Sequence, residues 1–345
     1  MATRRVRIGR RALLGGAASV FAIGRARAAD RITVATWAGE YGDLLAYTVD
    51  NPQMKPLDIT VTQELAAPPV RRSKMMAERG LSRGSLDVVF LDDLDAAAMA
   101  AMNLWEPLSQ IDIPNLPEVY PGLRVPYAVP HVFSALVIAY NPDTVIPAPS
   151  SFGDLWDPRL RNRIGFADSL ALYNVGAAAL AHGGSMTDLG PGMASLRDLK
   201  KLGVQTYASN EDLVKAFATG AVWVAPMWLA RIAYWQRMNV PVAHAYPEEG
   251  AIAYAFNAGV PANSPNKPAA KRYVNATLEP AVQATFALRL GYAPSIANAR
   301  LTGTLERAVA FTADERTKLH RMSYSYVAEN GKHVQDYWQN DFKIA

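Results

Sequence analysis

Short apolar runs alternate with amphipathic segments along the first part of the chain. Residues 31–37 (RITVATW), 58–65 (DITVTQEL) and 86–93 (LDVVFLDD) have the apolar content of strands. The last of these runs is continuous, which is typical of a strand buried on both faces. The segments 69–80 and 94–103 have the apolar spacing of helices. This order predicts a parallel α/β sheet with right-handed crossovers.

The alternation resumes after a proline-rich passage at 105–130. Residues 133–141 and 221–228 have the pattern of buried strands, and 170–181 has that of a helix. Residues 251–263 alternate small and aromatic side chains, in a strand pattern closer to that of the first half. We therefore expect two α/β lobes joined by more than one crossing strand, with a ligand cleft outside the carboxyl ends of strands.

The first 28 residues combine a basic start, a short apolar run and small residues at Ala26 and Ala28. This pattern predicts a signal peptide cleaved after Ala28, because the apolar run is shorter than the ~20 residues of a transmembrane helix. Arg10 and Arg11, directly before the run, resemble a twin-arginine export signal. We expect a secreted, periplasmic protein.

Removing this segment changes the charge of the chain. The segment carries seven arginines and no acid, so the remainder has 28 basic and 31 acidic side chains and a net charge of about −3. The remaining charge gives no support for nucleic-acid binding, which depends on clustered positive charge. The absence of cysteine excludes disulfides, thiolate nucleophiles and iron–sulfur clusters.

Signatures of catalysis and metal binding are sparse. The five histidines are scattered, with no HExxH motif, and no GxxxxGK[ST] phosphate loop occurs. No Tyr-Tyr pair of the kind used by ferric-ion binders is present either. We therefore expect a protein that is not an enzyme and holds no metal or cofactor. An exported enzyme or cofactor carrier is the alternative, since twin-arginine export suits proteins that fold before crossing the membrane.

Aromatic and acidic side chains gather where the expected strands end. The candidates are Trp37, Glu40, Tyr41, Asp92, Asp93, Asp168, Trp228, Tyr254 and Phe256. Each also has a purely structural interpretation, because an aspartate after a strand can cap the next helix and a single aromatic is more often part of the core. Their common position at strand ends in both lobes favours a ligand wall. Aromatic faces combined with carboxylates suit an organic cation.

Several segments, taken together in their order and spacing, resemble the periplasmic substrate-binding proteins of ABC importers, of the spermidine/putrescine-binding kind. They include TWAGEYGD (36–43), LDVVFLDD (86–93), NLWEPL (103–108), MWLARIAYW (227–235) and GYAPSIANA (291–299). The resemblance covers most of residues 30–345. It implies a type II two-lobed fold, a ligand in the cleft, hinge closure on binding and delivery to a membrane permease.

The resemblance also implies roles for individual residues. The aromatic positions of the family are matched by Trp37, Trp228, Tyr254 and Tyr292. Glu40 and Tyr41 match a Glu-Tyr pair of the family with one residue inserted, and Asp168 matches an acid that grips a ligand amine.

Two departures from the family pattern change the expected ligand. Ala171 and Phe256 stand where polyamine binders keep acids, which should cost several kcal/mol because each hydrogen bond to a charged group contributes roughly 1.5–3 kcal/mol. Asp93 is a candidate replacement charge. Arg231 keeps open a carboxylate-bearing ligand, with an internal salt bridge as its structural interpretation.

We therefore expect a periplasmic solute-binding component of an ABC transporter that captures a small organic, amine-containing, polyamine-like solute for import. The expected lobes are 29–135 with 252–295, and 136–251 with 296–345. The expected partners are the solute and an inner-membrane ABC permease, with no nucleic acid, and the chain is expected to act as a monomer. A binder of a carboxylate-bearing solute stands beside the exported enzyme as an alternative.

Overall fold

The structure, a computed structural model, describes residues 30–343, so the expected signal peptide at 1–28 lies outside the described residues. The strands are β1 (Asp30–Thr36), β2 (Ile59–Leu65), β3 (Val88–Asp92), β4 (Val129–Tyr140), β5 (Gly165–Ala167), β6 (Gln205–Tyr207), β7 (Val224–Trp228), β8 (Ala243–Ala245), β9 (Ile252–Gly259), β10 (Ala293–Pro294) and β11 (His320–Arg321). The α-helices are α1 (Glu40–Leu45), α2 (Pro68–Glu78), α3 (Asp93–Ala101), α4 (Ala171–Ala181), α5 (Gly190–Lys200), α6 (Asn210–Ala218), α7 (Leu229–Arg237), α8 (Lys267–Ala276), α9 (Pro280–Leu290), α10 (Gly303–Val309), α11 (Ala313–Thr317) and α12 (Tyr324–Tyr337).

The parallel sheet expected for the first part of the chain forms between β1, β2 and β3. β1 pairs in parallel with β2 on one edge and with β3 on the other. The rest of the large sheet is mixed rather than parallel, since β9 is antiparallel to both β3 and β4 and β4 is antiparallel to β7. A purely parallel sheet is therefore wrong beyond β3, because later strands return to the sheet by long connections that the local pattern does not specify.

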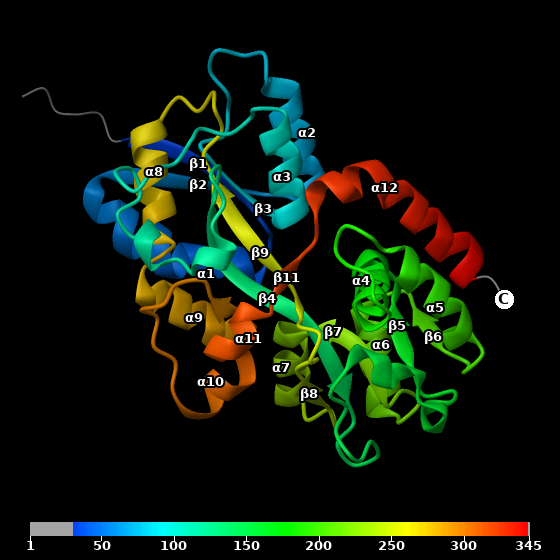
Figure 1. Ribbon diagram of the computed structural model, residues 1–345. Helices are drawn as coiled ribbons and strands as arrows, with labels where there is room; N and C mark the ends of the chain where they lie inside the picture. Colours follow the sequence, from blue (N-terminus) through cyan, green and yellow to red (C-terminus); the bar gives the residue numbers. More distant parts are fainter. Residues whose placement is uncertain (1–29, 344–345) are drawn as a thin grey trace, which may run out of the picture.

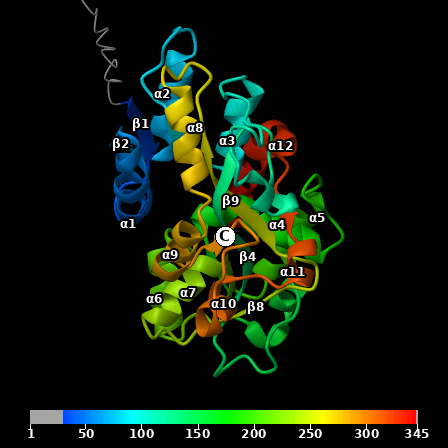
Figure 2. The ribbon, with the colours of Figure 1, turned by 90° about the vertical axis from the view of Figure 1, so that its left-hand side faces the viewer.

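Two strands lie at the centre of the molecule, between two groups of helices. β4 pairs with β9 through its first eight residues and with β7 and β8 through its last ones. Helices α2, α3 and α8 surround β1–β3, whereas α4, α5 and α6 surround β5–β7 (Figures 1 and 2). The continuous backbone of β4 thus passes from one half of the molecule to the other.

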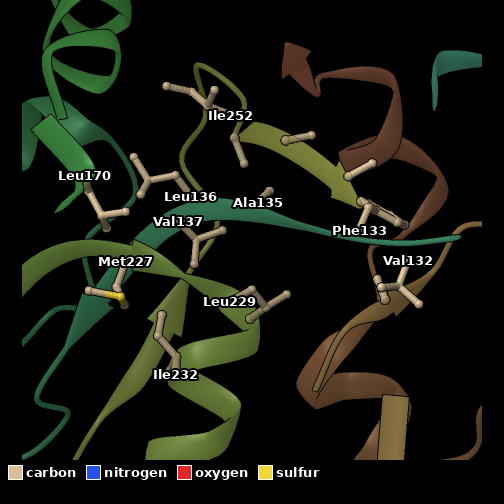
Figure 3. Packing of buried hydrophobic residues seen from close by; sticks show 14 of the residues in the cluster. Val132, Phe133, Ala135, Leu136, Val137, Leu170, Met227, Leu229, Ile232 and Ile252 are labelled. Carbon is tan, nitrogen blue, oxygen red and sulfur yellow. The ribbon is translucent and has the colours of Figure 1, made fainter. Parts of the chain in front are cut away.

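The buried core follows β4 along its length. All but the last of its twelve residues are buried. Val137 and Leu136 of β4 lie among Met227 of β7 and Leu229 and Ile232 of α7 (Figure 3). A strand covered on both faces is expected to be apolar throughout, as this one is.

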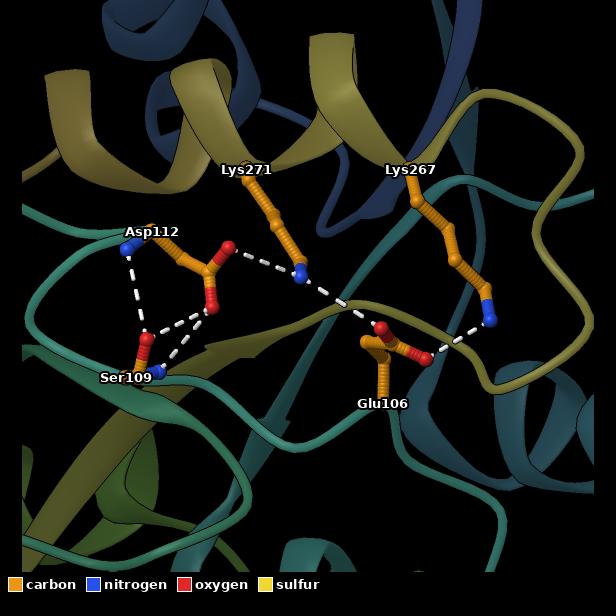
Figure 4. A network of polar contacts seen from close by, with 5 residues as sticks. All are labelled: Glu106, Ser109, Asp112, Lys267 and Lys271. Atoms are coloured by element: carbon orange, nitrogen blue, oxygen red, sulfur yellow. Dashed lines mark hydrogen bonds and ion pairs between the residues drawn. The ribbon is translucent and has the colours of Figure 1, made fainter.

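A network of charged groups fastens α8 to the segment that follows α3. The ammonium of Lys271 lies 3.0 Å from Asp112 Oδ1 and 3.3 Å from Glu106 Oε1. Lys267 contacts the other oxygen of Glu106 at 2.7 Å, and Ser109 Oγ donates to Asp112 at 2.8 Å (Figure 4). A network that shares partners in this way stabilises more than isolated surface pairs do.

Between residues 30 and 343, no helix is both long enough and apolar enough to cross a membrane.

Candidate functional site

Five of the predicted aromatic side chains form a continuous row. Starting after β1, the ring centroid of Trp37 lies 4.3 Å from that of Phe256, which lies 5.4 Å from Tyr254. Tyr254 is in turn 4.3 Å from Trp228, and Tyr292 lies 5.2 Å from Phe256. We call Trp37, Phe256, Tyr254, Trp228 and Tyr292 the aromatic row. Most of these contacts are tilted or edge-on, the geometry in which aromatic rings attract one another.

The strand pairing explains why these rings meet. Tyr254 and Phe256 are two residues apart on β9, so both side chains project from the same face of the sheet. Trp228 ends β7 opposite Leu136 of β4, and Leu136 pairs on its other side with Ile252 of β9. β4 therefore holds the end of β7 close to the start of β9.

A cavity of about 270 Å³ opens beside one end of the row. It is lined by Glu40, Trp228, Ala230, Arg231, Tyr234, Tyr254, Leu290 and Tyr292. We call it the aromatic cavity. Three members of the row and one predicted acid thus line the same space.

One aromatic side chain that the sequence did not single out extends the row. The ring of Tyr173, on α4, lies edge-on to Trp228 at 4.7 Å. Burial raises the pKa of the Tyr173 phenol, and the carboxylates of Asp92, Asp93 and Asp95 raise it further. Tyr173 therefore stays protonated and faces the acidic ends of β3 and α3. The sequence places Tyr173 in the expected helix that follows Asp168. That position alone does not distinguish a side chain of the binding site from an aromatic side chain of the core.

Tyr41 lies behind the row rather than in it. Its side chain is 7% exposed, and its hydroxyl is hydrogen-bonded to His131 Nδ1 at 2.8 Å. Burial raises the pKa of Tyr41 and lowers that of His131 to about 3, so both groups are neutral. Tyr41 supports the row through a ring contact with Phe256 at 5.6 Å.

Glu40 lines the aromatic cavity, and its carboxylate is paired with the guanidinium of Arg289. Its Oε1 lies 2.9 Å from Nη2 and 3.1 Å from Nε of Arg289 on α9. Gly39, just before it, has φ +73°, which allows the chain to turn from β1 into α1 at a position that a side chain would strain.

Two of the predicted acids are occupied by internal partners. Asp93 accepts hydrogen bonds from the Ala255 amide at 2.9 Å and Asn257 Nδ2 at 2.8 Å, and it pairs with Arg321 at 2.8 Å. Burial raises the pKa of Asp93 in spite of these partners. The interpretation of Asp93 as a replacement charge is weakened, because its oxygens already hold β9 and β11 to α3.

Asp168 is likewise engaged, by the C-terminal segment. Its Oδ2 lies 2.6 Å from Lys343 Nζ, and its Oδ1 accepts from Trp338 Nε1 at 3.1 Å. Asp168 makes no capping hydrogen bond, since the turn at Asp168–Leu170 begins after Ala167 without a side-chain cap. Helix α4 also begins after Leu170 without a side-chain cap, so the alternative interpretation of Asp168 as a helix cap is wrong.

Asp92 caps the following helix through one of its carboxylate oxygens. Its Oδ1 accepts from the Asp95 amide at 2.9 Å, so it caps α3 as the sequence indicates. Asp92 also pairs with Phe256 across β3 and β9, which places it next to the aromatic row.

Arg71, which no motif in the sequence marks, lies at the far end of the aromatic row. Its guanidinium lies 4.2 Å from the Trp37 ring centroid, and it donates to the Ala66 carbonyl through Nη1. Its Nε and Nη2 are buried and find no hydrogen-bond partner among the described residues. Burial lowers the pKa of Arg71 to about 10, while Asp92 and Asp95 act in the opposite direction. Arg71 therefore remains charged, balanced in part by these two acids.

The pentapeptide Gly80–Gly84 (GLSRG) has the spacing of a GxSxG nucleophile motif. Ser82 lies in an exposed loop between α2 and β3. A nucleophile elbow requires a sharp turn from a strand into a helix, which this loop does not provide. Among residues 30–343, no group of three or more histidines and acids is arranged to hold a metal ion.

A model of the family described as bacterial extracellular solute-binding protein matches residues 55–313. The chain belongs to this family. The spermidine/putrescine-binding periplasmic protein of Escherichia coli K12 is 28% identical over 179 residues, which are 51% of each chain. The gamma-aminobutyric acid-binding protein of Pseudomonas aeruginosa is 24% identical over 232 residues, 64% of this chain and 65% of that protein. The chain thus spans about half the length of the polyamine-binding relative in this match.

Solved structures confirm the two-lobed fold of the family. An ABC transporter structure from Clostridium perfringens superposes with a TM-score of 0.79 at 22% identity and covers 89% of this chain and 98% of its own. The expected α/β fold with two lobes is confirmed by this agreement.

Proposed function

We propose that this family member is the solute-binding component of an ABC importer and captures a small, amine-bearing organic solute in the periplasm. It would act as a monomer, deliver the solute to an inner-membrane permease and perform no chemistry on it. Family membership and relatives named for binding spermidine, putrescine and gamma-aminobutyric acid support this proposal.

The aromatic row is the observation that carries the proposal. Trp37 belongs to one proposed lobe, formed by residues 29–135 and 252–295. Trp228 belongs to the other, formed by residues 136–251 and 296–345. Phe256 and Tyr254 lie between them on β9, and the rings are in contact. A solute inserted along the row would touch both lobes at once, and its binding energy would favour the closed arrangement over the open one.

The acid beside the row supplies the amine preference. Within the described part of the chain, the second carboxylate oxygen of Asp92 makes no hydrogen bond; Asp92 pairs with Phe256 across the sheet, and its charge also acts on Tyr173 and Arg71. An ammonium group there would gain a charge-assisted hydrogen bond and the attraction of nearby ring faces.

Thermal unfolding with a panel of linear amines and amino acids tests the proposal. A solute present at 100 times its dissociation constant adds about 2.7 kcal/mol to the stability of the folded chain. Trp228→Ala should abolish the shift. The matched control is Trp223→Ala, because Trp223 packs under Arg163 at the opposite end of β7. No shift with any amine-bearing solute, or an equal loss in both variants, would contradict the proposal.

A further inference from the structure

A cavity of about 390 Å³ lies on the opposite face of β4 and β9 from the aromatic row. It is lined in part by Phe133 of β4 and Ala253 of β9. Neighbouring residues of a strand project to opposite faces, so the side chains of Ala253 and Tyr254 point away from each other. Phe133 pairs with Ala255 across β4 and β9, and paired residues share a face, so Phe133 lies on the face of Ala253. We call this space the rear cavity.

The lining of the rear cavity is mostly apolar and comes from segments far apart in the chain. Residues 120–123 contribute to it, as do α11 and the residues that lead from α11 into β11. A cavity of this volume, with apolar walls and a few polar groups, has the character of a small-molecule site. The apolar side chains that line it are those of Pro121, Leu123, Phe133, Ala253, Ala313 and Leu319.

Arg316 of α11 brings a positive charge to the rear cavity. Its guanidinium lies 4.5 Å from the ring centroid of Tyr120, and its Nη1 donates to the Phe311 carbonyl. Within residues 30–343, Arg316 makes no ion pair, and its Nε and Nη2 make no hydrogen bond. The second cation of the lining, Arg321, lies 2.8 Å from Asp93 and is balanced by it. Since none of the described lining residues is an acid, the cavity has a net positive charge.

One acid lies on the far side of Arg316. A smaller cavity of about 80 Å³ shares Tyr120, Phe133 and Arg316 with the rear cavity and is also lined by Glu306. Among the described residues, the Glu306 carboxylate makes no ion pair with Arg316. Glu306 therefore leaves the hydrogen-bond donors of the guanidinium unoccupied.

The chemistry of the rear cavity matches a ligand that has an apolar body and one carboxylate. The Nε and Nη2 donors of an arginine form a planar fork that binds a carboxylate through two parallel hydrogen bonds. We propose that the rear cavity is a second ligand site, which binds an apolar monocarboxylate such as a medium-length acyl chain. The carboxylate would pair with Arg316, and the chain would lie against Phe133 and Ala253. The sheet separates this ligand from a solute bound along the aromatic row, so the inference does not depend on the proposed function.

Calorimetric titration of the full mature chain with octanoate, octan-1-ol and octylamine tests the charge requirement. We expect octanoate to bind at least tenfold more tightly than the alcohol or the amine, which have the same chain. Butanoate should bind at least tenfold more weakly than octanoate, because a shorter chain buries fewer methylene groups. Absence of octanoate binding, or equal binding of octylamine, would overturn the proposal.

Arginine variants locate the carboxylate. Arg316→Gln should weaken octanoate binding at least tenfold, leave octan-1-ol affinity unchanged and keep the melting temperature near that of the parent chain. Arg316→Lys should recover part of the loss, because it restores the charge without the planar fork. The matched control is Arg307→Gln, since Arg307 lies on α10 and its Nη2 donates to Thr304 Oγ1 at 3.4 Å.

Two results would overturn the assignment to the rear cavity. The first is an equal loss of octanoate affinity in Arg316→Gln and Arg307→Gln, which would reduce the effect to the general charge of this surface. The second is a loss in Arg231→Gln while Arg316→Gln binds like the parent chain. Because Arg231 lines the aromatic cavity, that result would place the carboxylate there instead.

Discussion

Replacing Lys343 with Met removes the cation that lies 2.6 Å from the Asp168 carboxylate. The side chains of Asp168 and Lys343 are 17% and 29% exposed, so the pair lies between the exposed and the buried case. Exposed pairs contribute about 0–1 kcal/mol, and breaking a buried pair costs about 3–5 kcal/mol. We therefore expect Lys343→Met to lower the free energy of unfolding by roughly 1–3 kcal/mol, a value between these limits. In this variant the other carboxylate oxygen of Asp168 still accepts the hydrogen bond from Trp338 Nε1.

Urea unfolding of the parent chain, Lys343→Met, Asp168→Asn and the double variant measures this coupling. The double variant should recover part of the loss, because neither partner is then left without its counterpart, and the expected coupling is about 0.5–3 kcal/mol. Solute affinity should change little in all three variants. The reasoning fails if Lys343→Met unfolds like the parent chain while Asp168→Asn loses solute affinity tenfold or more. That result would return Asp168 to the role of an acid that grips the solute.

Two further predictions concern stability. Burial lowers the pKa of His131 to about 3. Below about pH 6.5 the His131 side chain is therefore protonated in the unfolded chain but stays neutral in the folded chain. Stability should therefore fall by up to about 1.4 kcal/mol per pH unit between pH 6.5 and 4. Burial raises the pKa of Asp95 to about 6, so protonation of Asp95 increases the stability of the folded chain as the pH falls. Because this effect opposes that of His131, the urea unfolding experiments should be done with the Asp95→Asn variant. A flat profile there would contradict the account. Gly259→Ala should lower the free energy of unfolding by about 1–3 kcal/mol, because its Cβ would lie 2.5 Å from the Trp105 ring. Gly122→Ala, which meets no atom within 4 Å, should unfold like the parent chain, and equal effects would refute the packing argument.

The elements that the sequence predicts are those whose signal is local. The continuous apolar run at 86–93 predicts β3, and the helical pattern at 170–181 predicts α4 within one residue of its observed start. The cap at Asp92 is also local, because it depends on an amide three residues away. The aromatic row was partly predictable, since strand alternation alone places Tyr254 and Phe256 on one face.

The ionic partners of the acids could not be predicted in the same way. Asp168 meets Lys343 across 175 residues, and Asp93 meets Arg321 across 228 residues. These pairs depend on where the C-terminal segment returns to the sheet, and no periodicity in the chain encodes that path. The net charge of the aromatic cavity follows from the same kind of contact, because Glu40 is neutralised by Arg289 on a distant helix.

A crystal structure of the chain with a bound solute tests the central claim most directly. The account predicts that the solute lies along the aromatic row, in contact with Trp228 and Tyr254, with one end in the aromatic cavity. The rear cavity, lined in part by Tyr120, Phe133 and Arg316, provides the contrasting location. Solute density there, with the aromatic cavity filled only by water, would contradict the account.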